Sequence, residues 1–208
     1  MLFRWFKRAF DFISSLLLFI VISPVFLVLM LLVRVKLGSP IFFTQVRSGM
    51  NQKPFKLIKF RTMTNAVDEN GELLPDEQRQ TKFGGFLRSS SLDELPELLC
   101  IIKGDMSVIG PRPLPTAYDE YYTEREKKRF KVRGGLIPPD SVDKDPVISW
   151  NKQFEYEAEY AESLSLMNDI KIFINVFKII FLRENTDYGN FVRRPLSEER
   201  KGQVIEHD

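Results

Sequence analysis

The sequence is poor in the two residues that most often build nucleophilic triads and metal sites. It has one cysteine, Cys100, and one histidine, His207, among 208 residues. A single cysteine excludes an internal disulfide and a cysteine-ligated metal site. A single histidine beside the C-terminus argues strongly against a Ser-His-Asp triad, a Cys-His pair or a histidine-built zinc site. Any chemistry is therefore expected from carboxylates, lysine, arginine, tyrosine and an oxygen-ligated metal.

An excess of charge of one sign is also nearly absent. The chain carries 30 Lys and Arg against 28 Asp and Glu, which leaves a formal charge of +2. This balance gives no global argument for nucleic-acid binding. The length fits one domain with an appendage and is sufficient to bury a core. A hydrophobic content of 44% with 18 Phe is high for a soluble domain and directs attention to a membrane segment.

Charged residues are missing entirely from Phe12 to Val33. As a straight helix this stretch would be roughly 33 Å long, just enough to cross the core of a bilayer. Basic residues flank both of its ends, so the positive-inside rule gives no orientation. Ser23-Pro24 lies at the midpoint, where a proline kinks a helix. Two interpretations stay open: a kinked spanning helix, and a re-entrant helix that bends at Pro24 and returns to the cytoplasmic face.

A second apolar segment, Leu166–Leu182, has only a narrow polar stripe. It is too short to span a membrane. Its pattern predicts a helix that lies either in a core or in the membrane interface.

Residues 55–63 alternate in a way that predicts a strand. A period of two places Lys59 and Arg61 on one face and Ile58 and Phe60 on the other. Two adjacent cations repel each other unless an anion lies between them, and phosphate is a good candidate. The alternative is a solvated basic edge that prevents aggregation.

Residues 89–102 carry an acidic pair directly before an apolar run that predicts a helix. Pro96 suits a first helical turn, so Asp93 and Glu94 are expected near the N-terminus of this helix. Ser91 and Glu94 have the spacing of a capping box, which explains the same residues without catalysis. The functional alternative is that one carboxylate attacks phosphorus or holds Mg²⁺ while the other handles protons or metal. The helix end and nearby cations are expected to keep Asp93 ionised.

Two further features have functional and structural interpretations. Pro111 and Pro113 bracket Arg112 and fix its backbone, which suits a guanidinium that is pre-organised for a diphosphate. The alternative is a structural proline-rich turn. Asp143 and Asp145 have the D-x-D spacing by which many nucleotide-sugar glycosyltransferases hold a divalent metal, although a three-residue pattern is weak.

Several motifs, taken in their order, resemble the small monotopic phosphoglycosyl transferases, the bacterial sugar transferase family that starts lipid-linked glycan assembly. The resemblance covers the chain from Phe6 to Leu182. It rests on Lys7-Arg8-x-Phe10-Asp11, Ser23-Pro24, Gly38-Ser39-Pro40, Lys59-Phe60-Arg61-Thr62-Met63, Ser91-Leu92-Asp93-Glu94-Leu95-Pro96, Lys103-Gly104-Asp105-Met106-Ser107, Gly110-Pro111-Arg112-Pro113 and Asp169-Ile170-Lys171.

The resemblance implies transfer of a phospho-sugar from a UDP-sugar to undecaprenyl phosphate, with Mg²⁺ and release of UMP. The acidic pair of the family corresponds to Asp93 and Glu94, which implies that Asp93 is a covalent nucleophile, Glu94 its assistant, and both ligands of the metal. The re-entrant helix of the family breaks at the Ser-Pro matched by Ser23-Pro24. The remaining candidate residues would clamp phosphates (Lys59, Arg61, Arg88 and Arg112) or play supporting roles (Asp105 and Asp169).

The expected fold is α/β, in the helix-rich α+β sense. A re-entrant helix over residues 1–36 precedes a catalytic domain over 37–185, with a small sheet and interfacial amphipathic helices, and a polar tail over 186–208. The expected location is the cytoplasmic face of the bacterial inner membrane. The expected partners are a UDP-sugar, undecaprenyl phosphate and membrane lipid, without nucleic acid, and homodimer formation stays open.

One stretch departs from the family. Its members usually carry Pro-Gly-Ile/Leu-Thr-Gly-x-Ala-Gln-Val before the Ser-Trp matched by Ser149-Trp150. This chain instead has Arg133-Gly134-Gly135-Leu136-Ile137-Pro138-Pro139-Asp140-Ser141. The loop Gly134–Pro146 therefore leaves the sugar and the glycan pathway open. Two other functions also stay open: a D-x-D glycosyltransferase that moves a sugar without its phosphate, and a catalytically silent membrane-anchored scaffold of glycan assembly.

Overall fold

The computed structural model describes residues 2–143, 148–181 and 193–201. The chain divides into two compact units, and each is described by itself. Unit 1 comprises residues 1–11, 46–55 and 104–208, and unit 2 comprises residues 12–45 and 56–103.

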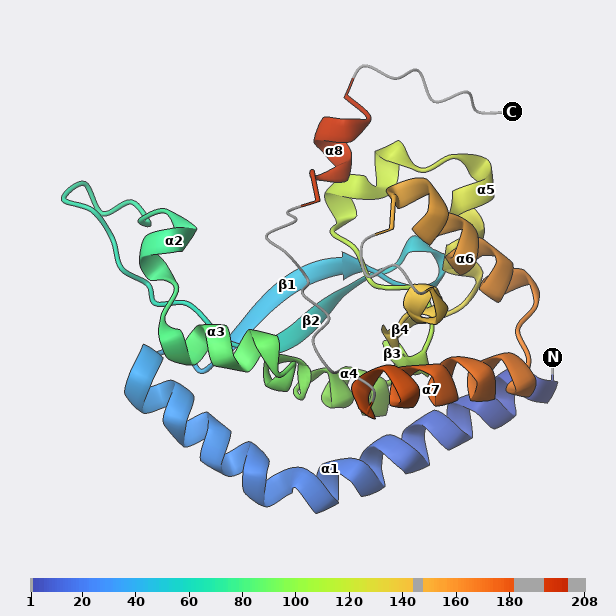
Figure 1. The fold of residues 1–208 in the computed structure, drawn as a ribbon, viewed down its shortest axis with the longest axis horizontal. Helices are drawn as coiled ribbons and strands as arrows, with labels where there is room; N and C mark the ends of the chain where they lie inside the picture. The colour runs from blue at the N-terminus through green and yellow to red at the C-terminus, as the bar shows by residue number, and fades with distance from the viewer. Residues whose placement is uncertain (1, 144–147, 182–192, 202–208) are drawn as a thin grey trace. The chain divides into compact units, whose positions relative to one another are not determined.

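The first element is a long helix, α1 (Leu2–Leu37), with a proline inside it. The segment Phe3–Leu37 is long and apolar enough to cross a membrane, and an 18-residue window within it has a mean hydropathy of 3.2 and is 17% buried. Because a core helix of a soluble protein would be mostly buried, this exposure favours a membrane segment. The helix bends near its middle (Figure 1). The Ser23 hydroxyl donates to the Ile20 carbonyl at 2.8 Å, the carbonyl that Pro24 leaves without its helical partner. The predicted kink is therefore confirmed, and it suits both membrane interpretations.

Unit 2 is built on one face of α1. Its buried side chains recur at helical spacing and pack against Phe60 and Leu87 in a single apolar cluster. The α1 residues of this cluster are Phe26, Leu29, Val33 and Leu37. Gly38, with φ of +84°, ends the helix. The elements that follow are β1 (Phe42–Ser48), β2 (Pro54–Phe60), α2 (Asp76–Arg79), α3 (Lys82–Ser89), a 3-10 turn η2 (Leu92–Glu94) and α4 (Glu97–Lys103).

β1 and β2 pair as a hairpin around the 3-10 turn η1 (Met50–Gln52). The predicted strand is confirmed but ends at Phe60, so Arg61 lies beyond it. Phe60 is buried in the core, as the predicted alternation requires.

Unit 1 contains a parallel pair of short strands, β3 (Met106–Ile109) and β4 (Gly134–Ile137). Their register pairs Met106 with Gly134 and Ile109 with Ile137. A Cβ added at Gly135 would lie 2.1 Å from the backbone nitrogen of Gly110. Only glycine allows this close approach of two backbones.

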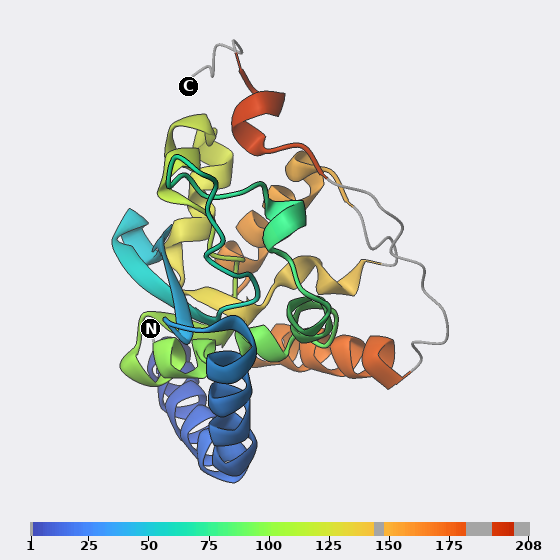
Figure 2. The ribbon, with the colours of Figure 1, turned by 90° about the vertical axis from the view of Figure 1, so that its left-hand side faces the viewer.

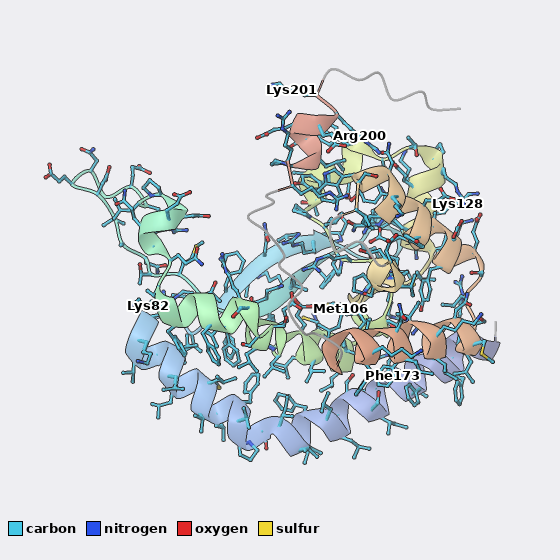
Figure 3. The ribbon with its side chains drawn as sticks, in the orientation of Figure 1. Lys82, Met106, Lys128, Phe173, Arg200 and Lys201 are labelled. Carbon is cyan, nitrogen blue, oxygen red and sulfur yellow. The ribbon has the colours of Figure 1, made fainter. Side chains whose placement is uncertain are left out.

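Short helices surround this strand pair. They are η3 (Thr116–Tyr121), α5 (Glu124–Lys127), η4 (Lys128–Lys131), η5 (Pro139–Val142), α6 (Trp150–Glu162), α7 (Leu166–Phe181) and α8 (Leu196–Glu199). The core contains an aromatic cluster of Tyr122, Phe130, Trp150 and Phe154. The views in Figures 1 and 2 agree that α8 lies beside η3. Arg200, labelled in Figure 3, forms an ion pair of 2.7 Å with Glu126.

The helix-rich α/β class with little sheet is confirmed, since the described residues contain two two-stranded sheets among many helices. The helix predicted from residue 166 is also confirmed as α7. Of the predicted tail over 186–208, residues 193–201 are described and include α8, whose Leu196 is fully buried. The rest of that tail lies outside the described residues.

Candidate active site

The acidic pair lies in a short turn whose backbone is strained at its start. Asp93 and Glu94 occupy η2, directly before α4, so their predicted place before a helix is confirmed. The preceding residue, Ser91, has φ of 56° and ψ of 17°, in the left-handed region. This backbone conformation costs a residue with a Cβ roughly 1–2 kcal/mol of free energy. Such strain persists where the surroundings impose it, which is often at functional sites.

The capping-box interpretation of this turn is wrong. Within the described part of the chain, the Ser91 side chain makes no capping hydrogen bond to η2. A capping residue normally has an extended backbone, and Ser91 does not. The Glu94 side chain instead accepts from Lys59. Helix capping therefore does not account for the acidic pair.

Lys59, on β2, joins the acidic turn to α4. Its Nζ lies 2.6 Å from Glu94 Oε1 and 3.2 Å from Glu97 Oε1. Lys59 also lowers the pKa of Asp93 electrostatically. Three carboxylates thus surround one lysine. Sequence reasoning missed Glu97, although its position three residues after Glu94 places both on one side of a helical turn.

The pKa of Asp93 is raised above its ordinary value. Burial is the largest cause, and the neighbouring Glu94 also raises it. Lys59 and Arg88 lower the pKa but do not offset these two effects. Desolvation therefore outweighs the cations in setting the direction of the shift, and the expected ionisation of Asp93 at neutral pH stays a prediction. A desolvated carboxylate with a raised pKa is a stronger nucleophile than a solvated one.

The acidic turn also belongs to the part of unit 2 that packs on the membrane-type helix. Leu92 and Leu95, which flank the pair, pack against the apolar cluster that contains Phe26 and Val33 of α1. The carboxylates are therefore held close to a helix suited to lie in lipid. A substrate phosphate at a membrane surface would be within reach of such a turn.

The two candidate phosphate-binding arginines of unit 2, Arg61 and Arg88, differ in exposure. Arg88, at the end of α3, is exposed, and its Nε donates to Thr62 Oγ1 at 2.9 Å. Arg61 is buried, and its guanidinium donates to the Leu37 carbonyl and, at 2.7 Å, to the Ser39 carbonyl. Arg61 therefore holds the turn that follows α1. The geometry favours Arg88 as a phosphate ligand, and the phosphate role of both arginines stays a prediction.

The other candidate residues lie in unit 1. Arg112 is exposed, while its backbone N–H donates to Glu157 at 3.0 Å and its carbonyl accepts from Arg129. Asp169 accepts from Lys7 at 2.8 Å and from the Tyr160 hydroxyl at 2.6 Å. Asp169 therefore links the start of α1 to α7 and α6.

Burial lowers the pKa of Arg133, and Asp105, which precedes β3, partly opposes this by favouring the charged guanidinium. The supporting role of Asp105 stays a prediction.

Metal binding can be judged from the donor atoms present. Among the described residues, no group of three or more His, Cys, Asp or Glu side chains is arranged to hold a metal. Mg²⁺ nevertheless needs only one or two carboxylates when substrate phosphates and water complete its coordination. The oxygens of Asp93 and Glu94 fit this requirement. Asp143 of the D-x-D pattern accepts from Tyr156 and pairs with Lys152, while Asp145 lies outside the described residues.

Known proteins match nearly the whole chain. The family model described as bacterial sugar transferase matches residues 2–183. The chain is 42% identical to the uncharacterized sugar transferase EpsL of Bacillus subtilis (strain 168), over 89% of this chain and 92% of that protein. It is 39% identical to a UDP-glucose:undecaprenyl-phosphate glucose-1-phosphate transferase of Klebsiella pneumoniae, over 83% of this chain but 40% of that protein. A protein of Caulobacter vibrioides with the same name is 31% identical, over 86% and 71% of the two chains.

Proposed function

The chain belongs to the bacterial sugar transferase family, and on that premise we propose that it transfers a phospho-sugar from a UDP-sugar to undecaprenyl phosphate and releases UMP. The observation that carries this proposal is the desolvated Asp93 carboxylate in a strained turn beside Glu94 and Lys59. The names of the Klebsiella and Caulobacter relatives support both substrate classes.

In the first half-reaction, the Asp93 carboxylate attacks the β-phosphorus of the UDP-sugar. A bond forms between this phosphorus and an Asp93 oxygen, and the bond from phosphorus to the bridging oxygen of the diphosphate breaks. UMP leaves with the electron pair. The exposed Arg88 guanidinium is available to neutralise the phosphate charge. A bound Mg²⁺ would supply further charge neutralisation for the diphosphate.

In the second half-reaction, a phosphate oxygen of undecaprenyl phosphate attacks the same phosphorus. The bond to Asp93 breaks, the carboxylate is regenerated, and the lipid leaves with a diphosphate-linked sugar. Lys59 holds Glu94 and Glu97 in place through both steps. Because Leu92 and Leu95 fix the turn on α1, the lipid phosphate can reach Asp93 from the membrane surface.

The adduct itself gives the direct test. Wild-type protein incubated with a UDP-sugar alone should gain a phospho-sugar mass on the peptide that contains Asp93 and should release one equivalent of UMP. UDP-glucose is the first donor to use, since it is named for two relatives. UDP-galactose is the second, since an Erwinia amylovora relative is named UDP-galactose-lipid carrier transferase.

The same assay separates the other functions. A D-x-D glycosyltransferase would release UDP in place of UMP, and a silent scaffold would release neither. Asp76→Asn is a matched control because Asp76 is an exposed acid on α2 of the same unit. It should form the adduct as the wild type does. An adduct on a residue other than Asp93, or turnover that proceeds without any adduct, would overturn the assignment.

We also propose that α1 is re-entrant, with both ends on the cytoplasmic side. The support is the cations on both flanks, the bend, and the satisfied carbonyl at Ile20. Cysteines introduced at positions 4 and 36 should both resist a membrane-impermeant thiol reagent added outside intact cells. The native Cys100 is buried, so its background labelling should be low. Labelling at position 4 would establish a crossing helix.

A further inference from the structure

Unit 1 has a hollow at the start of α1 that the proposed reaction does not use. Five cations and one acid contribute to its lining: Arg4, Lys7, Arg8, Lys131, Arg133 and Asp11. They come from the first turns of α1, from the end of η4 and from the residues that join η4 to β4. Parts of the chain far apart in sequence therefore bring positive charge to one place.

Neighbouring acids contact some of these cations. Asp11 accepts from Ser107 and, at 3.3 Å, from the backbone N–H of Val108. Lys7 lies 3.9 Å from Asp11 and 2.8 Å from Asp169. These contacts engage Lys7 with two carboxylates. Asp11 and Asp105 also act electrostatically on Arg133.

Two of the guanidinium groups lie close to the same backbone. Arg133 Nε donates to the Gly104 carbonyl at 2.8 Å. A Cβ added at Gly104 would lie 3.1 Å from Arg8 Nη2. Burial lowers the pKa of Arg133, and Arg8 lowers it further. Cations held close together and partly desolvated gain free energy when an anion enters between them.

Exposed apolar side chains adjoin these cations. Trp5, Phe6 and Phe10, on the same turns of α1, are 74%, 54% and 60% exposed. The Lys7–Asp169 bond attaches these turns to α7, whose Phe173 (Figure 3) and Phe177 are also exposed. Aromatic side chains that alternate with arginines are typical of a protein surface that inserts into the headgroup region of a bilayer. A ligand of this hollow would therefore come from the lipid headgroup region.

We propose that this hollow binds the phosphate of an anionic membrane phospholipid. Arg4, Arg8, Lys131 and Arg133 hold the headgroup phosphate, while Trp5 and Phe10 lie among the acyl chains. Its lining shares no residue with the acidic turn of unit 2. It anchors the start of α1 at the membrane surface whether or not the chain transfers a sugar, so lipid binding and UMP release can fail independently.

The test measures binding of soluble short-chain lipids to the full chain in neutral detergent, by native mass spectrometry or calorimetry. Dihexanoyl phosphatidylglycerol should bind the wild type, and dihexanoyl phosphatidylcholine should bind much more weakly. The double variant Arg4→Gln/Lys131→Gln removes two exposed cations of the lining. Each basic residue near an anionic surface contributes roughly fivefold to affinity. The double variant should therefore bind phosphatidylglycerol roughly 30-fold more weakly than the wild type.

Two further variants keep the result interpretable. Lys53→Gln/Lys56→Gln removes the same charge from exposed positions outside the lining and should bind as the wild type does. Arg4→Lys/Lys131→Arg keeps the charge and should retain affinity within about threefold.

Three results would overturn the proposal: unchanged binding by the Arg4→Gln/Lys131→Gln variant, equal binding of the two lipids, or an equal loss in the Lys53→Gln/Lys56→Gln control. Displacement of phosphatidylglycerol by inorganic phosphate or UMP at equal concentration would assign the hollow to a soluble phosphate and overturn its assignment to lipid.

Discussion

Two clusters of paired charges, one in each unit, differ in what surrounds them. Arg129 and Glu157 of unit 1 lie 2.9 Å apart, with side chains 2% and 0% exposed, against an aromatic core. Lys59 and Glu94 of unit 2 lie 2.6 Å apart with side chains 20% and 26% exposed. The first pair is closed to ligands, whereas solvent reaches the second.

The two pairs also differ in the direct contacts of their acidic side chains. The carboxylate of Glu157 accepts from Gln153 and from the backbone of Arg112 in addition to its pairing with Arg129. Around Lys59, Glu97 pairs with the same cation as Glu94, and Asp93 lies within its electrostatic reach. Burial raises the pKa of both Asp93 and Glu157, so the direction of the shift does not separate the two clusters. A closed pair that ligands cannot reach orders the fold, and an open group of three carboxylates near one lysine is suited to a cationic or phosphoryl ligand. Burial of charge alone therefore does not identify a site.

The largest effect should come from Asp93→Asn. This change keeps the shape of the side chain and removes the attacking oxygen, so turnover should fall by at least about 1,000-fold. UMP release and adduct mass measure it. A variant that keeps most of its turnover would show that Asp93 is not the nucleophile and would remove the contrast between the two clusters.

Breaking the closed pair should instead destabilise the fold. Arg129→Met leaves Glu157 buried without its cation, which should lower the free energy of unfolding by about 3–5 kcal/mol. Denaturant or thermal unfolding measures this. The control is Arg125→Met, since Arg125 pairs with Glu155 on the solvent-exposed surface and its loss should destabilise the protein far less. Similar losses in the two variants would mean that the buried pair has no special structural role.

The loop that departs from the family offers an intermediate effect. Gly135→Ala places a methyl group against the backbone of Gly110 and should destabilise the protein by roughly 1–3 kcal/mol. Thermal unfolding measures this loss.

Replacing residues 138–146 by the corresponding family residues leaves Gly134 and Gly135 in place and should change which UDP-sugar is used. UMP release across a donor panel measures the second effect. Equal loss with every donor would show that the loop serves folding or catalysis rather than sugar choice.

Local patterns in the sequence predicted the features that depend on neighbours along the chain. The kink at Pro24, the strand before Arg61 and the helix from residue 166 follow from proline chemistry and periodicity. The environment of Arg61 was not predictable, because the carbonyl of Leu37 that it binds comes from a distant helix end.

The acidic turn shows the same limit of local patterns. The spacing of Ser91 and Glu94 is that of a capping box, and only the backbone angles of Ser91 show that none forms. Glu97 resembled an ordinary acid in a first helical turn, because its contact with Lys59 depends on packing between β2 and α4.

The smallest predicted effect concerns stability and pH. Burial raises the folded-state pKa of Asp93 above its value in the unfolded chain, which is about 3.9. Above both values Asp93 is ionised in both states, and the folded state carries the desolvation cost of the charge. Below both values the proton is bound in both states and the cost disappears. Asp93→Asn, which is neutral at every pH, should therefore be slightly more stable than the wild type at pH 7, by less than about 1 kcal/mol at this half-exposed position. The difference should vanish as the pH falls towards 3. Thermal unfolding of the two proteins between pH 3 and pH 7 measures it. A variant less stable than the wild type at pH 7 would mean that the Asp93 carboxylate stabilises its turn, and would place it with the closed pair of unit 1 rather than with an open site.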